Sequence, residues 1–287
     1  MKIILLSGFF VGLVYGLVAV GLVVIYRGSR VISFCYGETG MFAAMLFADL
    51  WTGKARHYPL GVALPLGVLI AAAIGAATEL ILVRRLRDEP RLTVIIGTFG
   101  ISAFLLVLAG RRWGSNARSL GPLVRGIGPK VFGLRIAPEQ LLILGVCAVV
   151  LVGLHVLYNH TALGLRMRAT AIDPYAAGQV GVNTNLTSLA SWSLAGAIAG
   201  ASAILIAPLV GFSIFFMTAL AIRGLAAALV GGLTNTVAAF VTGVLFGLFE
   251  ALAGYLNKTP GLVDFGLAVF IIGLLMVRPG GLVRGEY

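Results

Sequence analysis

Charged residues are scarce in this chain of 287 residues, where 21 are Lys or Arg and 10 are Asp or Glu, 11% in all. A soluble globular domain carries about 25% charged residues. Hydrophobic residues make up 60% of the chain, and the mean hydropathy is +1.05. The composition therefore excludes an ordinary soluble enzyme or binding domain and indicates a protein whose solvent is the lipid bilayer.

Residues that carry chemistry are also rare. Cys35 and Cys147 lie in or beside apolar stretches, where a free thiol behaves as a small hydrophobe. The three histidines lack metal-ligand spacing, and there is no nucleophile with its base and no GxxxxGK[ST] phosphate loop. We therefore expect no metal, no cofactor and no catalytic activity, and any ATP used must be hydrolysed by another chain.

The net charge of +11 does not indicate a nucleic-acid partner. The basic residues are scattered between apolar runs, so they form no folded basic face of the kind that binds phosphates. In a membrane protein such an excess lies in the loops. We expect membrane lipid, and no nucleic acid, around this chain.

Long apolar runs account for most of the sequence, and a transmembrane helix needs roughly 20 such residues. In chain order the runs are residues 3–26, 31–50, 59–83, 92–110, 138–158, 186–210, 212–230, 236–256 and 262–277. They predict an all-α integral membrane protein, a polytopic bundle of about eight or nine transmembrane segments with broken or re-entrant helices. The whole chain, residues 1–287, forms a single transmembrane domain.

Polar residues interrupt two of these runs. Gly37-Glu38-Thr39-Gly40 divides the second run, and Arg223-Gly224 divides the seventh. An acid at membrane depth is unfavourable against lipid but suits a broken helix beside a polar path. Glu38 and the equally deep Glu250 therefore either line a translocation path or make a polar contact between helices. Glu79, close to Arg84 and Arg85, is expected to form an ion pair at the membrane interface.

Glycines recur four residues apart in two runs. Gly8, Gly12 and Gly16 lie on one helical stripe, and Gly196 and Gly200 are spaced in the same way. Such a stripe allows a second helix to pack closely. The chain has 39 glycines, so chance spacing is the alternative.

Two polar connections differ in character. The first, about residues 111–137, is the longest, and the second spans about residues 159–186. The basic residues of the first are Arg111, Arg112, Arg118, Arg125, Lys130 and Arg135. The clustered arginines of residues 84–91 place that short connection, and with it residues 159–186, in the cytoplasm, and residues 111–137 outside.

The second connection predicts a short helix with both ends fixed. Asp173 can cap a helix that begins at Pro174, and Gly181 can end it in the left-handed conformation. Ala176 and Ala177 offer a surface for close packing. Such a helix fits a groove on another protein, and an ordinary interfacial loop is the alternative.

This connection resembles the cytoplasmic loop of branched-chain amino acid permeases of ATP-binding-cassette importers, the LivH-type membrane subunit. The similar regions are residues 164–183, 34–38, 93–100, 230–247 and 277–282. The chain departs from the family where members read Asn-Phe-Ala-His and it reads Ser33-Phe34-Cys35-Tyr36, which leaves the solute open. It also has Gly178-Gln179 for a usual Arg-Leu, while Ala176, Ala177 and Gly181 are kept.

The resemblance implies a permease that moves branched-chain or similar hydrophobic amino acids across the bacterial inner membrane by alternating access. Its partners would be a homologous second permease, two cytoplasmic ATPase subunits and a periplasmic or extracellular solute-binding protein, with the C-terminus in the cytoplasm. An ATP-binding-cassette permease for urea, amides or another small solute, and a self-sufficient secondary transporter, remain alternatives.

The resemblance also assigns site residues. Coupling to the ATPase falls on Arg166, Arg168, Ala169, Asp173, Pro174, Ala176, Ala177 and Gly181. The translocation-path candidates are Gly37, Glu38, Thr39, Thr98 and Glu250. For docking of the binding protein, the candidates are Arg111, Arg112, Arg118 and Arg125, whose attraction to acidic patches would weaken with salt.

Overall fold

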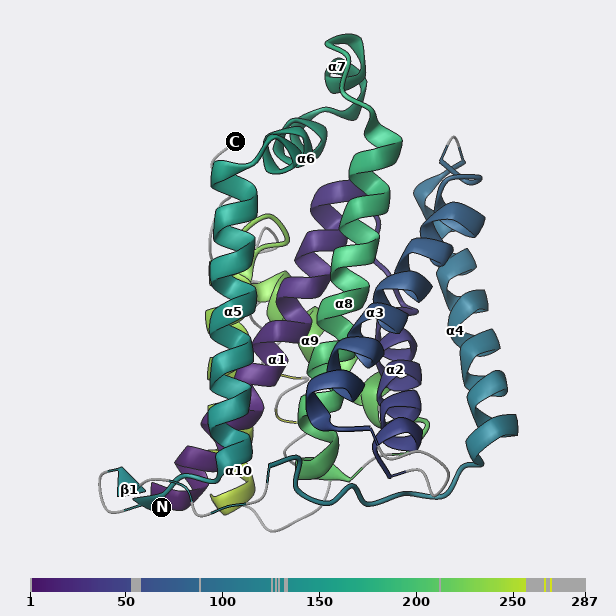
Figure 1. Cartoon of the computed structure of the whole chain (residues 1–287). Coiled ribbons are helices and arrows are strands. Elements are labelled where there is room, and N and C mark those ends of the chain that lie inside the picture. Colours follow the sequence, from purple (N-terminus) through teal and green to yellow (C-terminus); the bar gives the residue numbers. More distant parts are fainter. Residues whose placement is uncertain are drawn as a thin grey trace.

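The apolar runs form helices in the computed structural model (Figure 1). It describes residues 2–256 other than 53–57, 88, 125, 127, 129, 132–133 and 212, together with residues 266 and 269. The helices are α1 (Lys2–Ser29), α2 (Tyr36–Thr52), α3 (Leu60–Thr78) with the π-helical turn η1 (Glu79–Val83), α4 (Arg91–Trp113), α5 (Pro138–His160), α6 (Ala162–Ile172), α7 (Pro174–Gln179), α8 (Thr184–Val210), α9 (Phe216–Gly231) and α10 (Thr236–Leu256). The strands β1 (Lys130–Val131) and β2 (Leu134–Arg135) pair antiparallel.

Six helices in the described part are long and apolar enough to cross a bilayer: α1, α3 with η1, α4, α5, α8 and α10. Helices α2 and α9, with 17 and 16 residues, are shorter segments of the same bundle. The last apolar run, residues 262–277, lies outside the described residues except for residues 266 and 269, and the tail lies outside them as well. The prediction of a polytopic helical membrane protein is confirmed.

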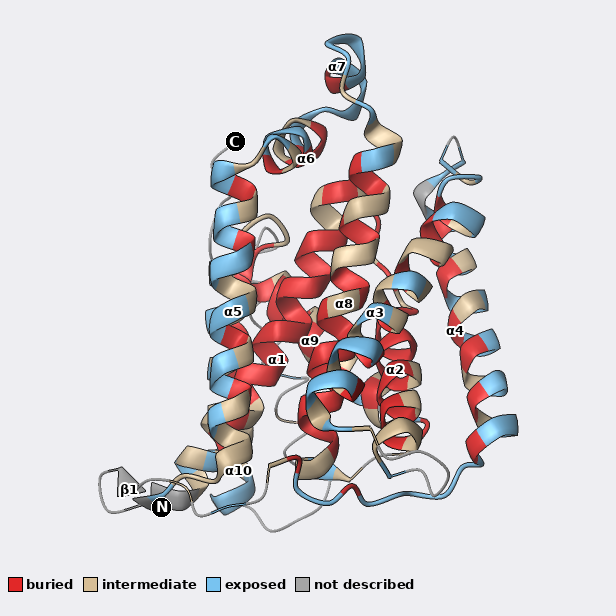
Figure 2. Ribbon diagram, in the orientation of Figure 1, coloured by how far each residue is buried: buried red, intermediate tan, exposed pale blue. Residues whose placement is uncertain are grey.

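Helices α1 and α8 form the centre of the bundle. The most apolar stretch of α1 is 89% buried and that of α8 67%, against 22–33% for the spans of α3, α4, α5 and α10. Buried residues therefore follow α1, α8 and the adjoining α2, while exposed residues mark the outer helices (Figure 2). The outer faces of α4 and α5 carry large apolar side chains, as a lipid-facing surface requires.

Glycines bring the central helices into backbone contact. A Cβ atom added at Gly247 of α10 would overlap the backbone of Gly12 in α1, and one at Gly243 would overlap Gly16. On the other side of the bundle, Gly196 of α8 packs in the same way against the backbone of Ala71 in α3. Both glycine spacings therefore serve close helix packing.

The breaks in the helices lie elsewhere than the sequence predicts. Residues 37–40 are helical, and α2 is preceded by a non-helical segment, residues 31–35, that follows Arg30 at φ 55°. Arg223 and Gly224 lie inside the continuous helix α9, so the predicted interruption at these two residues is absent from the described helix. A glycine is tolerated within these helices because Gly37 and Gly224 pack tightly against neighbouring helices.

The two long connections lie at opposite ends of the bundle (Figure 1). Helices α6 and α7 project from one end, here called the α7 end, and the chain from Gly114 to Ala137 runs along the other, the long-loop end. Arg87 donates hydrogen bonds to Thr184 at the start of α8. The residues 84–91 connection therefore lies at the same end of the bundle as residues 159–186, and the placement of both in the cytoplasm stays a prediction.

Candidate functional site

A buried carboxylate lies at the beginning of α2. Glu38 is only 2% exposed, and its Oε1 accepts a hydrogen bond of 2.9 Å from the Thr218 hydroxyl of α9. Its Oε2 has no hydrogen-bond partner within the described part of the chain. One oxygen of a buried acid thus remains available to a donor that the described chain does not supply.

The fold places this acid near the middle of the bundle. Helix α2 occupies the lower half of the bundle, and Asp49 near its end contacts Trp113 at the long-loop end (Figure 1). Its first turn, which contains Glu38, therefore lies away from both ends. A helix N-terminus favours negative charge, and Gly37 brings this turn against the backbone of α9, where an added Cβ would come within 2.8 Å of the Met217 carbonyl oxygen.

Thr98 holds the segment that leads into α2. Its hydroxyl accepts a hydrogen bond of 3.2 Å from the Phe34 backbone N–H and donates one of 2.7 Å to the Ile95 carbonyl within α4. The Phe34 ring stacks on Phe99 at 4.2 Å between centroids. The Thr39 hydroxyl donates to the backbone carbonyl that precedes α2. Four of the path candidates, Gly37, Glu38, Thr39 and Thr98, are thus gathered around the start of α2.

Glu250 belongs to a second cluster. Its Oε2 accepts a hydrogen bond of 2.8 Å from the Tyr15 hydroxyl, and its Oε1 lies 3.1 Å from a guanidinium nitrogen of Arg223. The side chains of Arg223 and Glu250 are 20% and 26% exposed. From the sequence, Arg223 was predicted only to interrupt a span, and Tyr15 was not predicted to belong to a site. Both residues are distant from Glu250 in the sequence and contact it only because α1, α9 and α10 pack together.

Glu79 differs from its prediction. It is fully buried in η1, and both carboxylate oxygens lack a hydrogen-bond partner within the described residues. Among the described residues it forms no ion pair with Arg84 or Arg85, although the positive charges of Arg87 and Arg84 act on it from a greater distance. The π-helical turn rotates this acid toward α8, where the Ser188 hydroxyl lies beside it without hydrogen-bond geometry.

The α7 end confirms the predicted local geometry. Asp173 Oδ1 accepts hydrogen bonds from the backbone N–H groups of Tyr175 at 2.8 Å and Ala176 at 3.1 Å, and Pro174 is the first helical residue. At the other end Gly181, with φ 84°, closes a Schellman motif in which the Val182 N–H donates to the Ala177 carbonyl at 3.0 Å. Both ends of α7 are therefore fixed.

The two alanines of α7 have different environments. Ala177 is 4% exposed and packs inside the chain, so it is unavailable to a partner, whereas Ala176 is exposed. Tyr175 and Val180 are 78% and 79% exposed. Every residue from Pro174 to Val180 other than Ala177 is exposed, and the two large exposed side chains are those of Tyr175 and Val180. Among the other coupling candidates Arg166 is exposed, and Arg168 and Ala169 are half-buried in α6.

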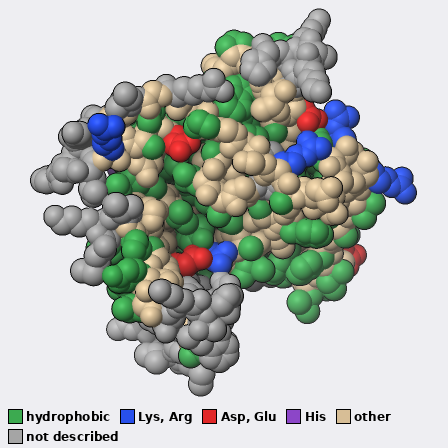
Figure 3. Space-filling model, turned by 90° about the horizontal axis from the view of Figure 1, so that it is seen from below, with side chains coloured by type: hydrophobic (Ala, Val, Ile, Leu, Met, Phe, Trp, Pro, Cys, Tyr) green, Lys and Arg blue, Asp and Glu red, His purple; other side chains and the backbone are tan. Residues whose placement is uncertain are grey.

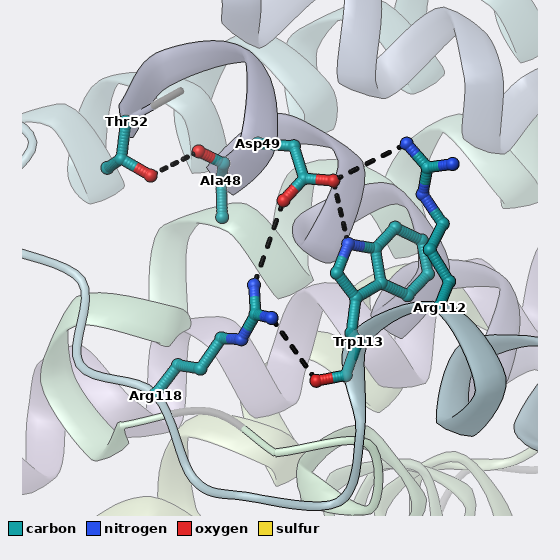
Figure 4. A network of polar contacts seen from close by, with 6 residues as sticks. All are labelled: Ala48, Asp49, Thr52, Arg112, Trp113 and Arg118. Carbon is teal, nitrogen blue, oxygen red and sulfur yellow. Dashed lines mark hydrogen bonds and ion pairs between the residues drawn. The ribbon is translucent and has the colours of Figure 1, made fainter. Parts of the chain in front are cut away.

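At the long-loop end an acid gathers several of the docking candidates (Figure 4). Asp49 accepts a hydrogen bond of 2.7 Å from the indole N–H of Trp113, and guanidinium nitrogens of Arg112 and Arg118 each lie 3.7 Å from its carboxylate oxygens. Arg111 is exposed, and Arg125 lies outside the described residues. The positive charge of Arg112 and Arg118 is therefore partly balanced within the chain.

Acidic and basic side chains meet amid hydrophobic ones on the face seen from the long-loop end (Figure 3). Across the residues described, no three His, Cys, Asp or Glu side chains form a group that could hold a metal ion. The clusters around Glu38 and Glu250 provide hydrogen-bonding groups and charged side chains inside an apolar bundle. Such polar groups within membrane helices are typical of solute and ion pathways.

A bundle of membrane-spanning helices with buried acids and a capped helix projecting from one end is the architecture of a membrane transport protein. The chain belongs to the family described as the branched-chain amino acid transport system / permease component, whose model matches residues 4–278. It is a permease of an amino acid transport system and a multi-pass membrane protein.

Similar proteins match over nearly the whole chain. The high-affinity branched-chain amino acid transport system permease protein BraD of Pseudomonas aeruginosa is 26% identical, over 97% of this chain and 94% of the relative. The corresponding permease LivH of Escherichia coli is 27% identical, over 96% and 93%. A probable branched-chain amino acid transport permease LivH of Methanocaldococcus jannaschii is 25% identical, over 94% and 89%.

Proposed function

We propose that this protein is the membrane-spanning permease subunit of an ATP-binding-cassette importer for branched-chain or similar hydrophobic amino acids. The observation that carries the proposal is α7, a helix fixed at both ends that presents Tyr175, Ala176 and Val180 to the outside of the bundle. Exposed apolar side chains on a rigid projection are suited to a groove on a partner protein. The names of the relatives supply the solute class.

This chain has no phosphate-binding loop, so the other steps of transport would belong to partner subunits. Two ATPase subunits would bind and hydrolyse ATP in the cytoplasm, and α7 of this permease would dock on one of them. A homologous second permease would complete the path, and a periplasmic or extracellular solute-binding protein would deliver the solute. In this arrangement the α7 end faces the cytoplasm, as does the C-terminus in the bacterial inner membrane.

Alternating access would use the polar residues inside the bundle. The free oxygen of Glu38, held by Thr218 at the start of α2, is a polar contact for a solute at mid-depth. Glu250 lies in the second cluster with Arg223. On the outside, Arg111 is exposed and, among the docking candidates that the structure describes, it forms no ion pair with Asp49, so its charge would be available to attract an acidic binding protein.

Reconstitution with the other subunits tests this function. The protein is co-expressed with a second permease, ATPase subunits and a binding protein from the same organism, purified, and placed in proteoliposomes. We expect ATP-dependent uptake of leucine, isoleucine or valine that requires the binding protein. Uptake by this protein alone, driven by an ion gradient, would instead establish a secondary transporter, and ATP-driven uptake of urea or amides would reassign the solute.

Removing the cap of α7 should weaken coupling. Asp173→Ala deletes the acceptor for two backbone N–H groups, which costs about 1 kcal/mol, a factor of about five in the population of the ordered helix. We expect ATP-driven uptake to fall by a similar factor with unchanged amounts in the membrane. Asp173→Asn retains a good cap and serves as the control. Equal uptake by the alanine and asparagine variants would show that coupling does not depend on the capped, ordered state of α7.

A further inference from the structure

Arg87 connects two segments that are distant in the sequence. Its guanidinium donates hydrogen bonds to the Thr184 hydroxyl at 3.0 Å, to the Thr184 carbonyl at 3.3 Å and to the side-chain oxygen of Asn185. These partners form the first turn of α8. Arg87 itself lies between η1, which ends α3, and the start of α4 at Arg91. One side chain thus links the α3–α4 connection to α8.

On the α8 side, the link lies next to α7. Only residues 180–183 separate α7 from α8, and they are ordered by the Schellman motif of Gly181 and by Asn183. Asn183 Oδ1 caps α8 by accepting from the N–H groups of Asn185 and Leu186. A displacement of α7 therefore reaches Thr184 and Asn185 through a connection that is held by hydrogen bonds at both ends.

On the other side, the link leads into the bundle through α4. Helix α4 packs against α2 and η1, and it begins at Arg91, close to Arg87. Seven residues further, about 10 Å along the helix, Thr98 hydrogen-bonds the segment that leads to Glu38. The hydrogen bonds of Arg87 thus lie at the α7 end of a continuous route from α7 to the start of α2.

The surroundings of Arg87 allow movement. A cavity of about 470 Å³ lies among Arg87, Thr184, Pro174 and the end of α1. Glu79 of the π-helical turn packs near α8; its carboxylate oxygens have no hydrogen-bond partner in the described chain, and the positive charges of Arg87 and Arg84 act on it. A buried polar group without a hydrogen-bond partner is costly, so this contact is a place where the packing of the bundle can change. Short π-helical turns inside helices frequently lie at functional sites.

We propose that Arg87 is the positioning residue that transmits the displacement of α7 to the α3–α4 pair, and through Thr98 to the start of α2. The inference rests on the proposed importer function and assigns Arg87 a role that it performs through its hydrogen bonds to α8. Arginine suits this role because its planar group donates several hydrogen bonds in a fixed geometry, whereas lysine provides a single point charge.

The test uses the complete importer in proteoliposomes and measures the solute moved per ATP hydrolysed. Hydrogen bonds to a charged group are strong enough that their loss in Arg87→Ala should lower this ratio about tenfold. Arg87→Lys should give an intermediate value. The control Arg85→Ala removes a neighbouring arginine that is exposed, as Arg87 is, and it should change the ratio by less than about twofold.

A double variant separates transmission from folding. If Arg87 acts through its partner, Asn185→Ala should lower the ratio in the same way, and the combination of both changes should be no worse than Arg87→Ala alone. Membrane amounts and melting temperature are measured for every variant. A wild-type ratio for Arg87→Ala, or additive losses in the double variant, would overturn the inference. Failure of the wild-type complex to take up solute with ATP would instead reject the proposed function.

Discussion

Glu38→Gln is expected to lower uptake at least about tenfold with little change in the amount of folded protein. Glutamine has nearly the same shape and still offers an oxygen to the Thr218 hydroxyl, so the contact between α2 and α9 survives. What is lost is the negative charge, along with an oxygen that has no partner in the described chain. The experiment therefore changes the chemistry at the start of α2 without removing its packing.

Two further variants sharpen this experiment. Glu139→Gln makes the same chemical change in the first turn of another helix, α5, at the long-loop end, and should leave uptake within about twofold. Thr218→Val removes the hydrogen bond to Glu38 while keeping the carboxylate, and should lower both uptake and stability. Uptake rates in proteoliposomes decide the result. If Glu38→Gln transports like the wild type, the acid is a structural contact between helices.

Gly247→Ala is expected to destabilise the protein by about 2 kcal/mol or more. Replacing glycine by alanine within a helix normally stabilises the helix by about 1 kcal/mol. A loss of stability in Gly247→Ala would therefore identify a steric clash as the cause. Here the new Cβ would overlap the backbone of Gly12, and neither helix can yield without separating α1 from α10. Because α1 is the most buried span, the loss of this contact should reduce the amount of folded protein in the membrane.

Gly153→Ala in α5 is the matched control. In the described part of the chain, no atom of a packing neighbour lies within 4 Å of a Cβ added there, so the helix propensity of alanine should raise the melting temperature or leave it unchanged. Thermal unfolding in detergent and quantitation of membrane protein measure both variants. Equal behaviour of Gly247→Ala and Gly153→Ala would mean that the close approach of α1 and α10 does not stabilise the bundle.

Much of the helix layout was predictable because hydrophobicity is a property of consecutive residues. The runs of residues 92–110, 138–158 and 236–256 appear as α4, α5 and α10 with boundaries that differ by a few residues. The cap of α7 was equally accessible, since Asp173 and Gly181 act on N–H and carbonyl groups within a turn of themselves. The roles of these residues in coupling stay predictions.

The interruptions show the limit of this reasoning. Glycine beside an acid at residues 37–40 suggested a break, yet this turn is helical because Gly37 packs against α9 and Glu38 is bound by Thr218. The environment of Glu79 could not be predicted either. Its proximity to Arg84 in the sequence suggested an ion pair at the surface, but in the structure Glu79 is buried in the π-helical turn, which packs against α8.

The sequence by itself determined that this is a polytopic helical membrane protein with a capped helix between two of its spans, because burial in lipid and helix capping depend on neighbouring residues. Only the tertiary structure decided which glycines pack, which acid meets which donor, and that Arg87 joins α8. Those contacts unite residues as far apart as Tyr15 and Glu250, and their pairing is set by the rotation and depth of whole helices.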